Sequence, residues 1–259
     1  MAAGKSIIPD PIMCRKRIYF IGDVHLGVRD APRSEAEQEG ALTAFLRAIR
    51  DDAETLYIVG DLFEFWFEYR TVVPTLGARV LFELYALVQA GVRVVCLPGN
   101  HDIWLGPYLA EQVGLKLPGG PITVTHQGLT LHIAHGDEFR TDWKFRISRA
   151  VLKNKICIAL FRLLHPDVGA CLARLVSRIS ASFILSRSVS SPDICLSAAK
   201  AKIAEGVDIV LCGHYHRPLL KTLDGGTLVV LGDWVSADVY AVLENGKIEL
   251  KKWEWKDAL

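Results

Sequence analysis

Short apolar runs rich in strand-forming residues recur along the chain, and each ends in glycine, proline or a polar cluster. A strand that is buried on both faces has this pattern, because it lacks the solvent-facing positions at which polar residues would alternate. The pattern predicts five buried strands, at residues 17–21, 55–59, 92–97, 129–134 and 207–212.

Amphipathic helices are predicted between these runs. Residues 34–50 open with Ser34 and Glu37, whose spacing is that of a capping box at a helix N-terminus. Residues 75–89 place apolar side chains on one helical face. Strands that alternate with helices indicate an α/β fold.

The C-terminal part of the chain has a different pattern. Between residues 218 and 255, short strand-like runs flank Asp224-Gly225-Gly226 and Glu244-Asn245-Gly246. Both tripeptides are typical of tight turns between antiparallel strands. We therefore expect an antiparallel meander that forms a second sheet packed on the first.

Residues 142–190 interrupt the alternation of strands and helices. Their apolar positions predict one helix that ends at His165 and Pro166, and a second helix with its apolar face at positions 168–183. From residue 140 to residue 200 the chain carries eleven Lys or Arg against three Asp. We expect a locally basic helical cap at 142–190, inserted into a main domain made of 17–141 and 191–259.

Composition indicates a folded protein of ordinary charge. Of 259 residues, 51% are hydrophobic and 23% are charged, with a net charge of +1, so no overall charge points to nucleic acid as a partner. The most apolar window, residues 156–164, is far shorter than the roughly 20 residues that span a bilayer. Residues 1–17 lack the apolar run of a secretory signal, and the six cysteines form no C-x-x-C pair, so we expect a reducing, cytoplasmic location.

Polar clusters follow the five predicted strands directly or within a few residues. Ligands of open α/β sheets collect at the carboxyl ends of the strands, so these separate clusters are expected to converge on one edge. The clusters are Asp23 and His25, then Asp61, then Asn100 with His101 and Asp102, then His135, and finally His214 with His216.

The donor types in these clusters favour a metal site. Carboxylate and amide oxygens combined with imidazole nitrogens, without thiolate, suit Mn²⁺, Fe or Zn²⁺. A carboxylate such as Asp61 can bridge two ions about 3.5–4 Å apart, which is the separation used for phosphoryl chemistry. A single Asp-x-His or His-x-His motif is more often a turn or surface feature. Five clusters in order, each at a strand end, predict a dinuclear metal centre.

The succession Asp-x-His, Gly-Asp, Gly-Asn-His-Asp, His and Gly-His-x-His, spread over residues 18–216, resembles the calcineurin-like metallophosphoesterases. The resemblance implies an α/β/β/α sandwich of two sheets, two divalent metal ions with Mn²⁺ expected, and hydrolysis of a phosphoester or phosphoric anhydride. It also implies that Asp61 bridges the two ions. The remaining ligands would be Asp23, His25 and His216 for one ion, and Asn100, His135 and His214 for the other.

Longer stretches, at 60–66, 135–137 and 213–218, are similar to the UDP-2,3-diacylglucosamine diphosphatases of lipid A synthesis, which also carry a helical cap. That similarity implies a nucleotide-linked glycolipid substrate, cleaved to UMP and lipid X at the cytoplasmic face of the membrane. The cap would hold acyl chains and contact the membrane peripherally; an apolar stripe that packs on the core is the alternative. The expected substrate contacts are Asn100, Arg140, Asp142 and Arg217.

His101 keeps the choice of substrate open, because those diphosphatases commonly have Arg at its position. With Asp102 orienting its ring, His101 is the expected catalytic residue, which stabilises the transition state or protonates the leaving oxygen during in-line attack by water. A departing alkoxide needs such an acid more than a departing phosphate does. The alternatives are a generic phosphoprotein phosphatase or nucleotide phosphodiesterase, and a scaffold that binds metals without turnover.

Overall fold

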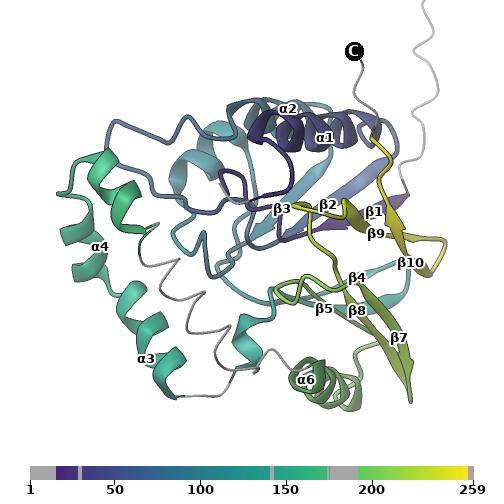
Figure 1. Ribbon diagram of the computed structural model, residues 1–259. Coiled ribbons are helices and arrows are strands. Elements are labelled where there is room, and N and C mark those ends of the chain that lie inside the picture. Colours follow the sequence, from purple (N-terminus) through teal and green to yellow (C-terminus); the bar gives the residue numbers. More distant parts are fainter. Residues whose placement is uncertain (1–15, 29–30, 141–142, 174, 176–191, 256–259) are drawn as a thin grey trace, which may run out of the picture.

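The structure is a computed structural model that describes residues 16–28, 31–140, 143–173, 175 and 192–255. Two sheets lie face to face in its middle (Figure 1). Helices α1 (Glu35–Ala48) and α2 (Ala78–Gln89) cover the outer face of the first sheet, and α6 (Pro192–Ala204) covers the outer face of the second. The predicted α/β/β/α sandwich is confirmed.

The first sheet has five strands in the order β10-β9-β1-β2-β3. Strands β1, β2 and β3 are parallel, and β3 forms one edge of the sheet. Strands β9 and β10 form an antiparallel hairpin, and β9 pairs with β1. The strands are β1 (Arg17–Ile21), β2 (Ala53–Val59), β3 (Arg93–Leu97), β9 (Val239–Glu244) and β10 (Lys247–Lys252).

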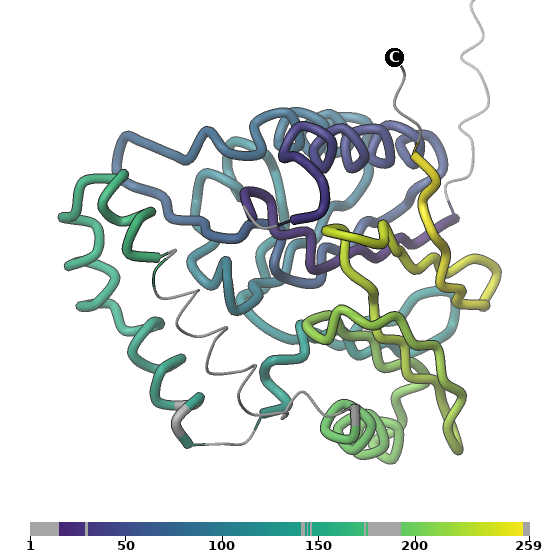
Figure 2. Tube along the Cα trace, viewed as in Figure 1, coloured from purple at the N-terminus to yellow at the C-terminus, as the bar shows by residue number. Residues whose placement is uncertain are grey.

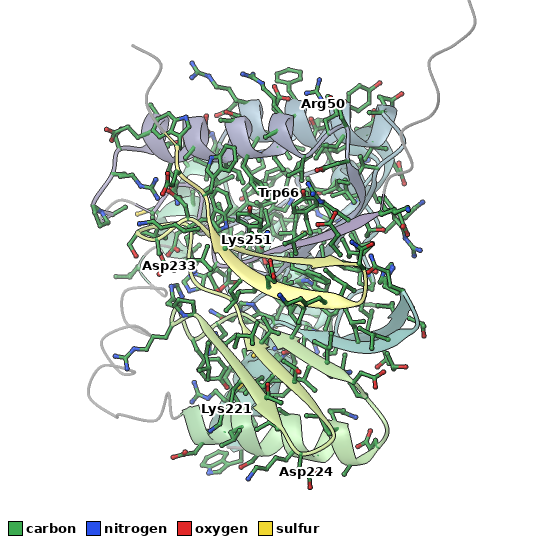
Figure 3. All side chains as sticks on the ribbon, turned by 90° about the vertical axis from the view of Figure 1, so that its right-hand side faces the viewer. Arg50, Trp66, Lys221, Asp224, Asp233 and Lys251 are labelled. Carbon is green, nitrogen blue, oxygen red and sulfur yellow. The ribbon has the colours of Figure 1, made fainter. Side chains whose placement is uncertain are left out.

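The second sheet also has five strands, in the order β4-β5-β6-β8-β7. Its inner strands β5, β6 and β8 are parallel, and the antiparallel strands β4 and β7 form its edges. Figure 3 views both sheets from the side, with Lys251 on β10 of one and Lys221 on β7 of the other. The strands are β4 (Ile122–His126), β5 (Leu129–Ala134), β6 (Ile209–Cys212), β7 (Leu219–Leu223) and β8 (Gly226–Val230).

All five predicted strands are present, but they are divided between the two sheets. The predicted meander is wrong, because the hairpin β7–β8 joins the second sheet while β9–β10 joins the first. Residues 231–238 carry the chain from one sheet to the other. The spacing of hydrophobic residues identifies a strand, and the turn residues identify a hairpin. Which strand lies next to it in a sheet depends on packing between segments far apart in the chain.

Three layers of apolar side chains fill the sandwich. One lies between the first sheet and helices α1 and α2, one between the two sheets, and one between the second sheet and α6. The capping box of α1 is confirmed: the Glu37 N–H donates to Ser34 Oγ at 3.3 Å, and the Ser34 N–H donates to the Glu37 carboxylate at 2.7 Å.

Helices α3 (Trp143–Leu152) and α4 (Lys155–Phe161) run along one side of the sandwich, as Figure 2 shows. The prediction of a single helix through this region is wrong. The side chain of Asn154 accepts the N–H groups of Ile156 and Cys157, which ends α3 and starts a new helix. Residues 166–173 are helical from Pro166 onward as predicted, and positions 176–183 of that second predicted helix lie outside the described residues.

Aromatic side chains join the cap to the main body. Phe161 of α4 packs against Phe65, Phe67 and Trp104, with ring centroids 4.8–6.0 Å apart. Other apolar side chains of α3, α4 and the following helix are exposed, among them Ile147, Val151, Ile156, Leu160, Leu163, Val168, Leu172 and Leu175. In the described part of the chain, every helix falls short of the length and apolarity that crossing a membrane requires.

Two short helical segments complete the fold, the π-helix η1 (Tyr108–Val113) and the 3₁₀ turn η2 (Asp137–Phe139). The η2 turn comes directly after β5 and precedes the cap, so it connects the second sheet to α3.

The packing between the sheets leads to a stability prediction. Phe20 of β1 is fully buried there and stacks on Tyr57 with ring centroids 5.3 Å apart. We expect Phe20→Ala to lower the free energy of unfolding by about 3–5 kcal/mol, because it removes buried contacts and leaves a cavity. Phe82→Ala is the matched control: this ring on α2 is 73% exposed, and its loss should change stability by about 0.5 kcal/mol or less. Denaturant unfolding with chelator present checks both, and equal effects would contradict this account of the core.

Candidate metal centre

The predicted ligands come together where parallel strands of both sheets end. Asp23 and His25 follow β1, Asp61 follows β2, and His135 follows β5. Among the described residues, three groups have donor atoms that all lie within 4.8 Å of one another. Two of them, Asp23 with His25 and His216, and Asp61 with His135 and His214, belong to the two ligand sets that the sequence predicts. The third joins His25 and Asp61 to His101.

Asp61 lies between the two groups of donors. Its Oδ2 is 3.2 Å from His135 Nε2 on one side and 3.7 Å from His25 Nε2 on the other. The Oδ1 of Asn100 lies 3.2 Å from the same His135 nitrogen, so Asn100 belongs with the His135 group. The His216 Nε2 is 3.8 Å from Asp23 Oδ1. The carboxylate of Asp61 therefore has the position required of a bridging ligand.

Five of the ligand residues have left-handed backbone conformations. Asp23, His25, Asp61, His214 and His216 have φ values from 50° to 70°. Such a conformation costs roughly 1–2 kcal/mol for a non-glycine residue, and strain of this kind gathers at functional sites. The surrounding hydrogen bonds hold it: the N–H groups of Val24 and His25 both donate to Asp61 O at 2.9 Å. The loops thus turn sharply off the strands and direct the side chains inward.

Gly99 permits the close approach of the loop after β3 to Asp61. A Cβ at position 99 would overlap the Asp61 carboxylate and come within 2.5 Å of the Asp61 backbone nitrogen. Only glycine leaves room for both loops here.

Asp102 does not orient the ring of His101, contrary to the sequence prediction. Its buried carboxylate accepts backbone N–H groups from residues 61, 62, 63 and 99, at 2.8–3.3 Å. Burial and the nearby Asp61 charge raise the pKa of Asp102 to about 6, although the backbone hydrogen bonds oppose this. Asp102 thus fixes the loops after β2 and β3 relative to each other.

Glu64 contacts the rings of both His25 and His101. Its Oε2 is 3.0 Å from His25 Nδ1 and 3.2 Å from His101 Nδ1. Because it accepts the Nδ1 hydrogen of His25, it leaves the Nε2 lone pair of that ring available to a metal ion. Glu64 is not among the functional residues that the sequence predicts. It lies three residues after Asp61, in the stretch that resembles the diphosphatases, but no general spacing rule marks it.

The electrostatics of the site suit metal binding. Burial lowers the pKa of His214, and neighbouring His135 adds to this, to about 3, so the ring is in the neutral form that metals bind. Burial alone would raise the pKa of Asp61, but the charge and hydrogen bond of His135 hold it well below its ordinary value. For His101, the hydrogen bond to Glu64 and the Asp61 charge outweigh burial and raise the pKa to about 9.

An orphaned polar atom shows that the donors fit a metal ion. The Nε2 of His25 is buried and has no hydrogen-bond partner, although it faces Asp61 and stands within the Asp23 and His216 group. A buried imidazole nitrogen without a partner is costly unless a ligand satisfies it. The donor set, oxygen and imidazole nitrogen without thiolate, is that of a divalent first-row metal.

Two of the predicted substrate contacts, Arg140 and Arg217, lie close in the chain to predicted ligands. Arg140 follows the η2 turn, and its guanidinium stands over the ring of Phe145 at 4.8 Å. Arg217 is exposed and follows His216 directly. Asp142 lies outside the described residues. These residues and Asn100 stay predictions as substrate contacts.

Comparison with known proteins agrees with the geometry. Residues 16–218 match the calcineurin-like phosphoesterase family. A UDP-2,3-diacylglucosamine hydrolase of Porphyromonas gingivalis is 31% identical over 263 residues, which cover 93% of this chain and 98% of the relative. The protein of that name from Aeromonas salmonicida is 30% identical and covers 90% and 92%. A dimetal phosphatase of Danio rerio has the same fold, with a TM-score of 0.51 and 12% identity over 94% of this chain and 96% of that one.

Two groups of oxygen and nitrogen donors with the buried Asp61 carboxylate close to both, at the ends of strands from two sheets, define a metal-dependent phosphoesterase. The chain belongs to the calcineurin-like phosphoesterase family, whose match covers all seven predicted metal ligands. Divalent metal ions are accordingly its cofactors.

The crowding at Gly99 can be tested with a single methyl group. Gly99→Ala should displace Asp61 and lower metal affinity or turnover about 10- to 100-fold, the range typical of changes next to a ligand. Gly120→Ala is the control, since a Cβ at position 120 meets no atom within 4 Å. Metal titration by calorimetry measures the effect. Equal metal affinity in the two variants would show that Gly99 does not set the position of Asp61.

The contacts of Glu64 give a second prediction at this centre. Glu64→Ala removes the acceptor for both Nδ1 groups and should weaken metal binding about 10- to 100-fold. Glu64→Gln keeps one oxygen acceptor and should retain an intermediate affinity. Metal content after dialysis against a series of free Mn²⁺ concentrations distinguishes the three proteins. If Glu64→Ala binds metal as the wild type does, the proposed orientation of His25 is wrong.

Proposed function

We propose that this protein hydrolyses the diphosphate of UDP-2,3-diacylglucosamine and releases UMP and lipid X. The observation that carries the proposal is the similarity to curated UDP-2,3-diacylglucosamine hydrolases over nearly the whole chain, cap included. The exposed apolar side chains of the cap support it, because a diacylated substrate needs an apolar surface for its acyl chains.

We propose Mn²⁺ as the native metal, with Fe or Zn²⁺ as alternatives that the same donors would accept. Bound divalent ions supply Lewis acidity that lowers the pKa of water and neutralises charge on the phosphoryl oxygens. Asp61 is proposed to be the ligand that both metal ions share, since its carboxylate lies close to both donor groups. His101 lies beside them, paired with Glu64, where a cationic ring stabilises negative charge on the substrate.

We propose that the cap, residues 142–190, binds the acyl chains and contacts the cytoplasmic face of the membrane. Exposed apolar residues of α3 and α4 lie beside lysines and arginines, a combination that suits anionic lipid headgroups. The described cysteines carry free thiols, in keeping with a reducing compartment. Asn100, Arg140, Asp142 and Arg217 are proposed to contact the substrate.

A generic phosphodiesterase is the second candidate, and His101 favours it. A ring with a pKa of about 9 carries a proton that it can give to a departing alkoxide. A phosphate that leaves from a diphosphate needs little protonation, so this proton would have less use in the first reaction.

Parallel hydrolysis assays separate the two candidates. UDP-2,3-diacylglucosamine and a simple aryl phosphodiester are compared with Mn²⁺, with chelator, and with Asp61→Ala. We expect metal-dependent release of UMP, much faster than aryl ester cleavage, and a loss of at least about 100-fold in Asp61→Ala because both donor groups lose their shared ligand. Cleavage of the aryl ester alone would reject the glycolipid substrate and leave the generic phosphodiesterase.

A further inference from the structure

Arg149 connects the first helix of the cap to the loop that carries a metal ligand. It lies on α3, and its guanidinium forms an ion pair with Asp137, whose side chain is only 1% exposed. A second nitrogen of the guanidinium is 3.5 Å from the Glu138 carboxylate. Asp137 and Glu138 come two and three residues after His135.

The two carboxylates give this contact its strength. They are adjacent in the chain and share the η2 turn, where the Gly136 N–H donates to Glu138 at 2.9 Å. Buried like charges of this kind need a cation nearby. Arg149 supplies it from the cap, with 16% of its own side chain exposed, so the position of α3 depends on the loop after β5.

A second contact holds the C-terminal end of the same helix. The indole N–H of Trp104 donates to the Leu152 carbonyl at 2.7 Å. Trp104 stands close after Asn100 and His101 in the chain, and its ring packs on Phe67 and Phe161. Loops that carry predicted ligands of the metal centre thus hold α3 through two contacts. The contact of Arg149 is an ion pair, and the contact of Leu152 is a neutral hydrogen bond.

We propose that Arg149 is a positioning residue that holds α3 against the His135 loop and thereby sets the preference of the enzyme for a substrate large enough to reach the cap. The preference for a glycolipid rests on the proposed function. Arg149 is not among the metal donors, so a small phosphoester that stays within the metal centre does not require it. A bulky substrate that must lie on both the centre and the cap does require it, since a displacement of about 1 Å in a positioning element costs up to 10²-fold in rate.

Arg149→Met tests this, because it keeps a side chain of similar length without the charge. Lys221→Met is the control, which removes one positive charge from an exposed position on β7, outside the cap and the metal centre. The ratio of kcat/KM for UDP-2,3-diacylglucosamine to that for the aryl phosphodiester is measured with Mn²⁺. We expect Arg149→Met to lower the ratio about 10- to 100-fold, Arg149→Lys to restore part of it, and Lys221→Met to leave it unchanged.

A general loss of folding would lower both activities in proportion and leave the ratio as in the wild type, so an unchanged ratio in Arg149→Met overturns the proposal. Amide hydrogen exchange over residues 143–152 tests the placement of α3 without any substrate. Exchange there should be faster in Arg149→Met than in Lys221→Met and the wild type, and equal exchange in all three proteins also overturns the proposal. If the wild type does not cleave the glycolipid, the proposed function fails, while the exchange result still decides the role of Arg149.

Discussion

The arrangement of the site depends on Asp61, because this residue contacts the loops after β1 and β3 at once. Its carbonyl accepts the N–H groups of Val24 and His25 from the loop after β1, and its carboxylate accepts the N–H of His101 at 2.9 Å from the loop after β3. Its own N–H donates to Asp102 at 3.3 Å. Asp61 makes all these contacts with φ of 52°, so the carboxylate proposed to bridge two metal ions is held in place by the backbone, which limits the reorganisation that metal binding would require.

Asp23 has the corresponding role between the two sheets. Its carboxylate accepts the His214 N–H, at 2.8 and 3.0 Å from the two oxygens, and its carbonyl accepts the Trp234 N–H at 3.1 Å. It therefore joins the end of β1 in the first sheet to the loop after β6 in the second. Both aspartates use the same carboxylate to hold a neighbouring loop and to face the metal donors. Replacing either one would thus disturb the backbone as well as remove a ligand.

The sequence was sufficient for the strands and the α1 capping box, because these depend on local period and local hydrogen bonds. It also identified the His and Asp residues whose donor atoms the structure brings together, and their role as metal ligands stays a prediction. It was insufficient to predict which segments far apart in the chain contact one another. The five predicted strands are divided between two sheets, and so are the two C-terminal hairpins. This division follows from tertiary packing, which the hydrophobic periodicity of a segment does not encode. Glu64 and Asp102 show the same limit at the site. Asp102 is next to His101 in sequence but accepts backbone N–H groups, whereas Glu64, 37 residues before His101, contacts its ring.

The position of His101 bears on both candidate substrates through its partner. Glu64 accepts its Nδ1 hydrogen and helps to raise the pKa of the ring to about 9, which makes the ring a fixed cation beside the metal donors at neutral pH. A diphosphate carries more negative charge than a phosphodiester. A cationic side chain stabilises this charge by binding the phosphate oxygens, without any proton transfer. Arginine, the residue that the resemblance to the diphosphatases implies at this position, would act in the same way through a permanent charge. In the proposed function, the Glu64 and His101 pair supplies this charge, so the histidine is compatible with cleavage of a diphosphate.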